Sequence, residues 1–340
     1  MKALRNYWDS KMKTRMFISK TPLRITFVGG GTDIRDYYSK HDKGAVLSAS
    51  INKFIYIVVN KKFDNKIRVS YSKTEIVDSV DRIEHPSVRE ALKLLQIDGG
   101  IEIVSISDIP SGGTGLGSSS TFLVGLLNAL HAWKGEFASP EQLAQEAVKI
   151  EREILREPGG KQDQYMAAYG GINMLEFYPD ESVVVKPVIS SETVREKLQE
   201  NLLLLYTGVQ RGSTEIHSAQ ARNVDRKSAS YDKMVKITEE AFASLSKGNY
   251  DSMGSYLHSN WKLKKELTDG ISSDFIDQAY EKAMRCGAAG GKLIGAGGGG
   301  FMLFYARPEL HETIVKEIGN MKPEQFRFEF QGSRIIHVGD

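Results

Sequence analysis

One stretch of the sequence restricts the possible folds more than any other. Residues 110–120 read PSGGTGLGSSS, and residues 121–130 read TFLVGLLNAL. The second run predicts a buried helix over about 118–133, because its leucines recur at core-facing spacing. They are Leu123, Leu126, Leu127 and Leu130. Unpaired N–H groups and the dipole at a helix start attract anions, and glycines let a phosphate approach the backbone. We therefore expect a phosphate-binding loop.

The loop differs from a Walker P-loop at one residue. Residues 112–119, GGTGLGSS, fit the spacing G-x-x-x-x-G-K-[ST] except that Ser118 stands at the lysine position. The missing positive charge must come from elsewhere, most simply from Mg²⁺ held partly by a serine hydroxyl. The alternative is that Ser118 only caps the helix while the glycines make a tight turn.

Two further glycine-rich stretches are open to more than one interpretation. GAGGGG at 295–300 precedes an apolar β-type run, not a helix, so it is a weak dinucleotide fingerprint. It is either a flexible hairpin or, as we favour, a place where the backbone approaches a ligand closely. In RITFVGGGTDIRDYY, residues 24–38, Asp33 is either a turn residue or an acceptor of hydrogen bonds from a polyol.

Composition excludes several function classes. The 340 residues, 41% hydrophobic and 26% charged, suffice for two packed domains. Forty-five Lys and Arg against 43 Asp and Glu give no overall field for nucleic acid or an anionic membrane, so anion binding must be local. The single cysteine, Cys286, excludes an internal disulfide framework. Charges interrupt every apolar window of residues 1–20, so we expect no signal peptide or membrane span, and a cytoplasmic protein.

Strands and helices are segregated along the chain. From about 192 to 285 the chain is polar and mostly helical apart from the run NLLLLYTG, and its end returns to strands around a helix beginning near Pro308. This favours an α+β fold with domains over 15–185 and 186–340. Strand-like runs in the first half cover 24–29, 54–60, 66–72 and 101–107.

A second helix of the first half begins at SPEQ. Ser139 is expected to cap it, Pro140 fits the first helical position, and Gln142 would complete a capping box. Its predicted buried face comprises Leu143, Ala147, Ile150 and Ile154.

Three motifs in order resemble those of the GHMP kinases. PLRITFVG matches P-x-R/K-[IV]-x-x-x-G, PSGGTGLGSSS matches P-x-G-x-G-L-G-S-S-[AS] with one extra residue before Gly115, and KLIGAGGGG matches K-x-x-G-A-G-x-G-G. The resemblance runs from Pro22 to about Phe304. It implies a two-domain kinase fold, with an N-terminal domain like domain 2 of ribosomal protein S5 and a ferredoxin-like C-terminal domain.

The resemblance also implies that ATP binds in a cleft and that a phosphoryl group passes to a hydroxyl. The residues it assigns to ATP are Gly113, Thr114, Gly115, Leu116, Gly117, Ser118, Ser119, Gly297 and Gly298. It assigns Mg²⁺ to Ser119 and Glu151, with Glu153 as the fallback for Glu151. The competing interpretation of Glu151 is a solvated helix carboxylate.

The segment EREILREPGGKQDQ places the family's aspartate at Asp163, our candidate general base. A helix N-cap is the structural alternative for this residue. Arg24, at the family's basic position, would lie near Asp163 and stabilise developing charge. Some family members are thought to work by transition-state stabilisation without a true base.

Within the superfamily, the sequence looks most like the D-glycero-D-manno-heptose 7-phosphate kinases, which phosphorylate the anomeric hydroxyl. Gly30, Gly31, Thr32 and Asp33 are the expected sugar contacts. A phosphorylated substrate needs a second anion site, for which Arg211 is the first candidate and Lys161 and Lys292 are further ones. His217 and His258 are interpreted as helix-surface residues.

Two other functions remain open. One is a different kinase of this fold, of fucose, galactose or mevalonate type, and the other is a nucleotide sensor without catalysis. We expect a small sugar-phosphate partner, no nucleic acid or membrane partner, and a monomer or homodimer.

Overall fold

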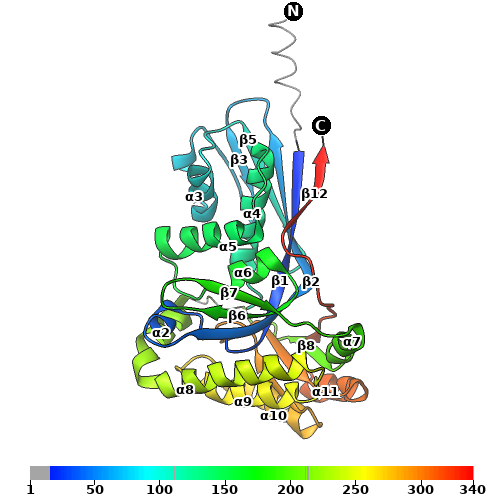
Figure 1. Ribbon diagram of the computed structural model, residues 1–340. Coiled ribbons are helices and arrows are strands. Elements are labelled where there is room, and N and C mark those ends of the chain that lie inside the picture. The colour runs from blue at the N-terminus through cyan, green and yellow to red at the C-terminus, as the bar shows by residue number, and fades with distance from the viewer. Residues whose placement is uncertain (1–15, 111, 211, 213, 340) are drawn as a thin grey trace, which may run out of the picture.

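The structure is a computed structural model that describes residues 16–110, 112–210, 212 and 214–339. Within these residues the chain forms two sheets (Figure 1). The first has the order β12-β1-β2-β5-β3-β4, with β6 paired to β2 and β7 to β6, and the second has the order β11-β8-β10-β9. The strands are β1 (Met16–Val28), β2 (Gly44–Lys61), β3 (Ile67–Ser70), β4 (Thr74–Val77), β5 (Ile101–Ser107), β6 (Ile172–Phe177), β7 (Val183–Pro187), β8 (Leu202–Tyr206), β9 (Gly290–Leu293), β10 (Phe301–Tyr305), β11 (Lys322–Pro323) and β12 (Arg334–Gly339).

Helices pack against both sheets. Helix α4 packs on β1 and β2 beside α5 and α6, whereas α8 packs on α9, which lies against β9, and α8 also contacts β2 of the first sheet. Runs of strands and runs of helices follow one another along the chain without strict alternation, which confirms the α+β prediction (Figure 1). The α-helices are α2 (Arg35–Tyr38), α3 (Pro86–Leu94), α4 (Ser118–Lys134), α5 (Pro140–Val148), α6 (Gln162–Tyr169), α7 (Glu192–Glu200), α8 (Thr214–Ser246), α9 (Met253–Glu266), α10 (Asp274–Arg285) and α11 (His311–Ile318). Short 3-10 turns are η1 (Val80–Arg82) and η3 (Pro308–Leu310), and η2 (Lys149–Ile154) is a π-helix.

The first two strands are longer than the sequence predicts. Strand β1 begins at Met16 and not near residue 24, because its buried polar residues find partners across the layer. The Ser19 hydroxyl donates to the carbonyl of Gly125 at 2.7 Å, and the hydroxyls of Thr21 and Ser333 lie 2.8 Å apart. A buried polar group with a partner costs little, so strand structure continues through residues that an apolar pattern omits.

The end of the chain returns to the first sheet. Strand β12 pairs antiparallel with β1, with Met16 opposite Gly339, and Figure 1 shows the red strand beside the blue one. Strand β7 runs across the expected domain boundary at residues 185 and 186. The boundary itself stays a prediction.

The helix that begins after Ser139 differs from the prediction at its far end. The Ser139 hydroxyl accepts from the Gln142 N–H at 3.2 Å, which confirms the cap, but the Gln142 side chain donates to Glu146 instead of completing a capping box. Beyond Val148 the helix widens into η2, and this wider turn rotates Ile154 out of the core to 43% exposure. The prediction that Ile154 is buried is therefore wrong.

In the described ranges, every helix is too short or too polar to cross a membrane.

Candidate functional site

Helix α4 begins without a side-chain cap. Its N-cap is Gly117, in the left-handed conformation at φ 79°, and the described residues provide no side-chain cap hydrogen bond. The Ser118 hydroxyl instead lies 3.4 Å from that of Thr114. The interpretation of Ser118 as a cap is therefore wrong. The amides of the first turn and the positive end of the helix dipole remain available to an anion.

A cavity of about 200 Å³, here called the loop cavity, lies in front of this helix start. Residues 112–115, 117–120 and 294–297 form much of its wall, together with Arg24, Glu151 and Asp163. Of the expected ATP contacts, Gly113, Thr114, Gly115, Gly117, Ser118, Ser119 and Gly297 line it.

Two expected ATP contacts lie outside this wall. The side chain of Leu116 is fully buried in the core, and its carbonyl accepts from the Arg24 N–H at 3.1 Å. The amide of Gly298 donates to Ile271 at 3.0 Å. Both residues therefore support the loop backbone rather than face the cavity.

The third glycine stretch is the hairpin connection between β9 and β10, which pair antiparallel. Its glycines meet other backbone directly: a Cβ on Gly295 would lie 2.5 Å from the Cα of Gly115, and one on Gly300 would lie 2.3 Å from the Thr114 carbonyl oxygen. The stretch is therefore a hairpin, and the close approach of a ligand to its backbone stays a prediction. The hairpin needs glycine because it packs on the loop before α4.

Glu151 lies behind the first turn of α4 with its carboxylate fully buried. It accepts from the Ser119 hydroxyl at 3.2 Å, from the Ser120 hydroxyl at 2.7 Å and from the Gln164 amide. The interpretation of Glu151 as a solvated carboxylate is wrong. The fallback, Glu153, is exposed, and the sequence did not single out Ser120.

The oxygen atoms around Glu151 suit a divalent cation. Its carboxylate and the Ser119 hydroxyl are hard oxygen ligands on the wall of the loop cavity, and its hydrogen-bond donors are neutral. Among the described residues, the guanidinium of Arg152 forms a long ion pair with this carboxylate, with Nη2 at 3.7 Å from Oε2. Mg²⁺ in nucleotide sites typically uses one or two protein oxygens and takes its other ligands from phosphates and water. These residues fit that pattern.

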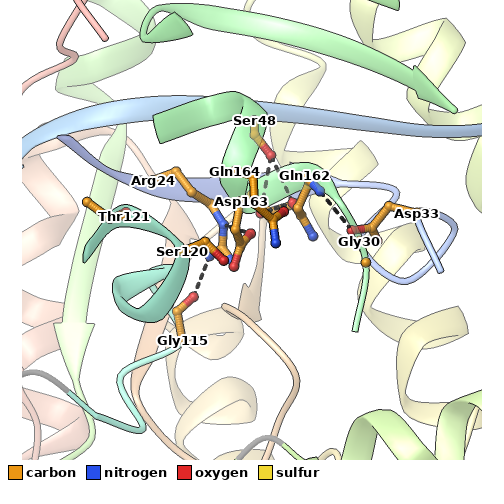
Figure 2. Close-up of polar contacts among 12 residues, drawn as sticks. Arg24, Gly30, Asp33, Ser48, Gly115, Ser120, Thr121, Gln162, Asp163 and Gln164 are labelled. Carbon is orange, nitrogen blue, oxygen red and sulfur yellow. Dashed lines mark hydrogen bonds and ion pairs between the residues drawn. The ribbon is translucent and has the colours of Figure 1, made fainter. Parts of the chain in front are cut away.

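Arg24 and Asp163 form a two-point ion pair on the wall of the loop cavity (Figure 2). Nε and Nη2 of Arg24 donate to the two oxygens of Asp163 at 2.7 and 2.8 Å, and Nη1 donates to the Gly115 carbonyl. The N-cap of α6 is Lys161, so the capping interpretation of Asp163 is wrong. A Cβ on Gly117 would lie 3.1 Å from Asp163, so the glycine lets this carboxylate reach the start of α4.

The triple-glycine segment lies beside this pair (Figure 2). Both Asp33 oxygens accept from backbone amides, of Gly31 at 2.9 Å and of Gln162 at 3.3 Å. Asp33 and Gly31 both line a small cavity of about 50 Å³, here called the bridging cavity, which shares Arg24 and Asp163 with the loop cavity.

Two other expected sugar contacts do not reach the bridging cavity. The Thr32 hydroxyl is buried, donates to the Ala45 carbonyl and accepts from the Ala45 amide. The Gly30 carbonyl accepts from the Lys264 ammonium at 2.8 Å. Arg211 lies outside the described residues.

A larger cavity of about 590 Å³, here called the outer cavity, adjoins the bridging cavity at Asp33, Ile34, Arg152 and Gly159. Lys161 lines it but is paired with Glu181, and Lys292 is buried in β9. Lys264, on the wall of the bridging cavity, was missed by the sequence reading, and burial lowers its pKa to about 8.

His217 was interpreted as a surface residue, yet it lines all three cavities. Burial, and then the charge of Lys264, lower its pKa to about 4, so the imidazole is neutral at neutral pH. A histidine near the start of a polar helix has no sequence pattern that marks it as a site residue.

Comparison with known proteins identifies the family in which this arrangement occurs. Residues 60–171 match the family model of the GHMP kinases N terminal domain, and residues 240–321 match that of the GHMP kinases C terminal. A D-glycero-alpha-D-manno-heptose 7-phosphate kinase of Campylobacter jejuni is 32% identical over 88% of this chain and 92% of its own length.

Two other proteins are similar at lower identity. The bifunctional fucokinase/GDP-fucose pyrophosphorylase of Arabidopsis thaliana is 26% identical over 88% of this chain and 30% of its own length. The crystal structure of a D-glycero-D-manno-heptose 1-phosphate kinase from Bacteroides thetaiotaomicron has a TM-score of 0.79 at 25% identity, over 95% of this chain and 100% of that one. Two glycine loops pack together at one helix start, beside a paired arginine and aspartate. Because the sequence also matches both family models and a kinase at 32% identity, the chain belongs to the GHMP kinase family and is a phosphotransferase.

Proposed function

We propose that the protein transfers the γ-phosphoryl group of ATP to the anomeric hydroxyl of D-glycero-D-manno-heptose 7-phosphate. The product is the 1,7-bisphosphate, a precursor of nucleotide-activated heptose. The observation that carries the reaction type is the place of Asp163, whose carboxylate is held by Arg24 on the wall shared by the loop cavity and the bridging cavity. An acceptor hydroxyl in the bridging cavity would meet both the carboxylate and a phosphate in the loop cavity.

These positions support the following reaction scheme. The anomeric oxygen attacks the γ-phosphorus, the bond to the β,γ-bridging oxygen breaks, and ADP leaves. Asp163 accepts the hydroxyl proton, and Arg24 holds the carboxylate in place while its charge stabilises the transferring group. The amides at the start of α4 bind the phosphates against the positive end of the helix dipole.

Mg²⁺, when bound, neutralises negative charge on the phosphates and so stabilises the transferring group. Ser119 and Glu151 would hold it. The buried donors Ser120 and Gln164 keep the Glu151 carboxylate oriented.

The outer cavity supports a phosphorylated acceptor. Its wall carries both signs of charge, but Glu181 is shared by Arg35 and Lys161. Burial, together with the nearby Glu151, raises the pKa of Glu157. Arg156 and Arg152 are further cations of the wall, although the Arg152 guanidinium also donates to the carbonyls of Gly160 and Glu157 and lies 3.7 Å from Glu151. We propose that these two arginines bind the 7-phosphate.

The second candidate is a sugar 1-kinase that acts on an unphosphorylated sugar, of fucokinase or galactokinase type. It is supported by the similarity to the fucokinase of Arabidopsis thaliana. A nucleotide sensor without catalysis is less favoured, because Ser119, Glu151, Arg24 and Asp163 are assembled together.

The test is a coupled assay of ADP release across sugars and sugar phosphates, with phosphorus NMR of the product to locate the new ester. We expect the highest kcat/KM with heptose 7-phosphate and a new phosphate at C1. A preference for free fucose or galactose would support the second candidate. No ADP release with any acceptor would refute both kinase proposals.

A further inference from the structure

We propose that His217 hydrogen-bonds a hydroxyl of the acceptor sugar and positions the sugar for transfer. The inference rests on the proposed function, since it needs a sugar in the bridging and outer cavities. It assigns a role to a side chain that the reaction scheme above does not use.

The first support is position. His217 is in the first turn of α8, a helix that packs against α9 in the second half of the chain. Nevertheless its side chain lines the loop, bridging and outer cavities. It therefore lies where an acceptor in the outer and bridging cavities would meet the phosphates in the loop cavity.

The second support is an unused polar atom. Nδ1 of His217 is buried and has no hydrogen-bond partner among the described residues. Leaving a buried polar atom without a partner is unfavourable, and the residue that carries this one borders three cavities, so a small shift of the ring would bring the atom to a ligand there.

The neutral charge of the His217 imidazole indicates which kind of ligand group it binds. The charged groups that act on the ring are Lys264, Asp33, Asp163 and Arg152. A neutral imidazole has one N–H donor and one lone pair, which match a hydroxyl that both donates and accepts. A phosphate is better served by the nearby cations, so the sugar is the partner we assign.

Three variants separate the role from general damage. His217→Leu removes both ring nitrogens, and His217→Asn returns a polar atom near the position of Nδ1. Arg222→Leu is the matched control, because Arg222 is an exposed residue of the same helix and lines none of the three cavities. Melting temperatures are measured for all three.

For His217→Leu we expect the KM for the sugar to rise roughly tenfold, as the loss of one hydrogen bond in a buried site predicts, with an unchanged KM for ATP. His217→Asn should recover much of this loss, and Arg222→Leu should behave like the unmodified protein. With a set of monodeoxy sugars, one analogue should bind equally poorly to the unmodified protein and to His217→Leu, which identifies the hydroxyl.

An unchanged sugar KM in a folded His217→Leu variant overturns the inference while leaving the kinase proposal intact. The inference is also overturned if His217→Asn and His217→Leu raise the sugar KM equally and no deoxy sugar gives the same KM with the unmodified protein as with His217→Leu. If the unmodified protein phosphorylates no sugar, the proposed function fails, and this inference fails with it.

Discussion

At the scale of single residues, the site depends on which carboxylates are held and by what. Asp163 is fixed by two hydrogen bonds from Arg24, whereas Glu151 is buried among serine hydroxyls and one amide. The arrangement of Asp163 suits a general base that must contact the acceptor hydroxyl, and the arrangement of Glu151 suits a ligand of a cation.

Asp163→Asn should retain ATP binding and lower turnover by roughly a hundredfold or more, because the amide cannot accept the proton. Binding is measured by calorimetry and turnover by ADP release. Asp225→Asn is a matched control that breaks the surface ion pair with Lys40 at 2.8 Å. Unchanged turnover in Asp163→Asn would remove this residue from the mechanism.

Glu151→Gln should raise the Mg²⁺ concentration needed for half-maximal activity by roughly tenfold or more, since an amide is a weaker ligand for a hard cation. The substitution keeps the shape of the side chain. The matched control is Glu153→Gln, two residues along the same π-helix and exposed. Equal Mg²⁺ requirements in the two variants would argue against Glu151 as the metal ligand.

At the scale of elements, the loop before α4 and the hairpin between β9 and β10 form one unit. Gly115, at φ 78°, would place a Cβ 2.4 Å from the Ile294 carbonyl oxygen. Glycine is required here because both the backbone conformation and the space exclude a side chain.

Gly115→Ala should therefore destabilise the protein by about 2 kcal/mol or more and weaken ATP binding. Gly112→Ala, in the same loop, is the control, because a Cβ on Gly112 would meet nothing within 4 Å. Urea unfolding and nucleotide titration of both variants provide the test. If the two alanine variants prove equally stable, the packing of the two loops is not as described.

Local sequence signals predicted some elements closely. The leucine stripe predicted α4, observed over Ser118–Lys134, and β5 is observed over the expected 101–107. Each depends on a regular spacing of apolar residues, helical in α4 and alternating in β5, that tertiary contacts only reinforce. The N-cap at Ser139 was also predicted from residues next to it in the sequence.

Features that depend on contacts between distant segments could not be predicted in the same way. The π-helix that exposes Ile154 is not encoded in apolar spacing, and the pairing of β12 with β1 joins opposite ends of the chain. The family motifs led to Arg24 and Asp163, but His217 and Lys264 enter the site only because α8 and α9 pack beside it.

At the scale of the whole molecule, the cavities lie where the two halves meet. Helix α4 rests on the first sheet, the glycine hairpin belongs to the second, and His217 comes from α8. A ligand in the loop cavity would therefore contact both halves and stabilise both together.

Hydrogen exchange measures this coupling. With Mg²⁺ and a non-hydrolysable ATP analogue, we expect slower amide exchange in peptides that cover 113–121 and also in those that cover 294–300. Peptides from β3 and β4, at the far edge of the first sheet, serve as the internal control. Slower exchange in the first loop alone would mean that the hairpin takes no part in binding.

The most direct test of the central claim is a crystal structure with Mg²⁺ and a non-hydrolysable ATP analogue. We predict that the triphosphate lies within about 3 Å of the amides at the start of α4, with the metal on Ser119 and Glu151 and the γ-phosphate facing Asp163. A triphosphate bound anywhere else would contradict the proposed site and every role assigned within it.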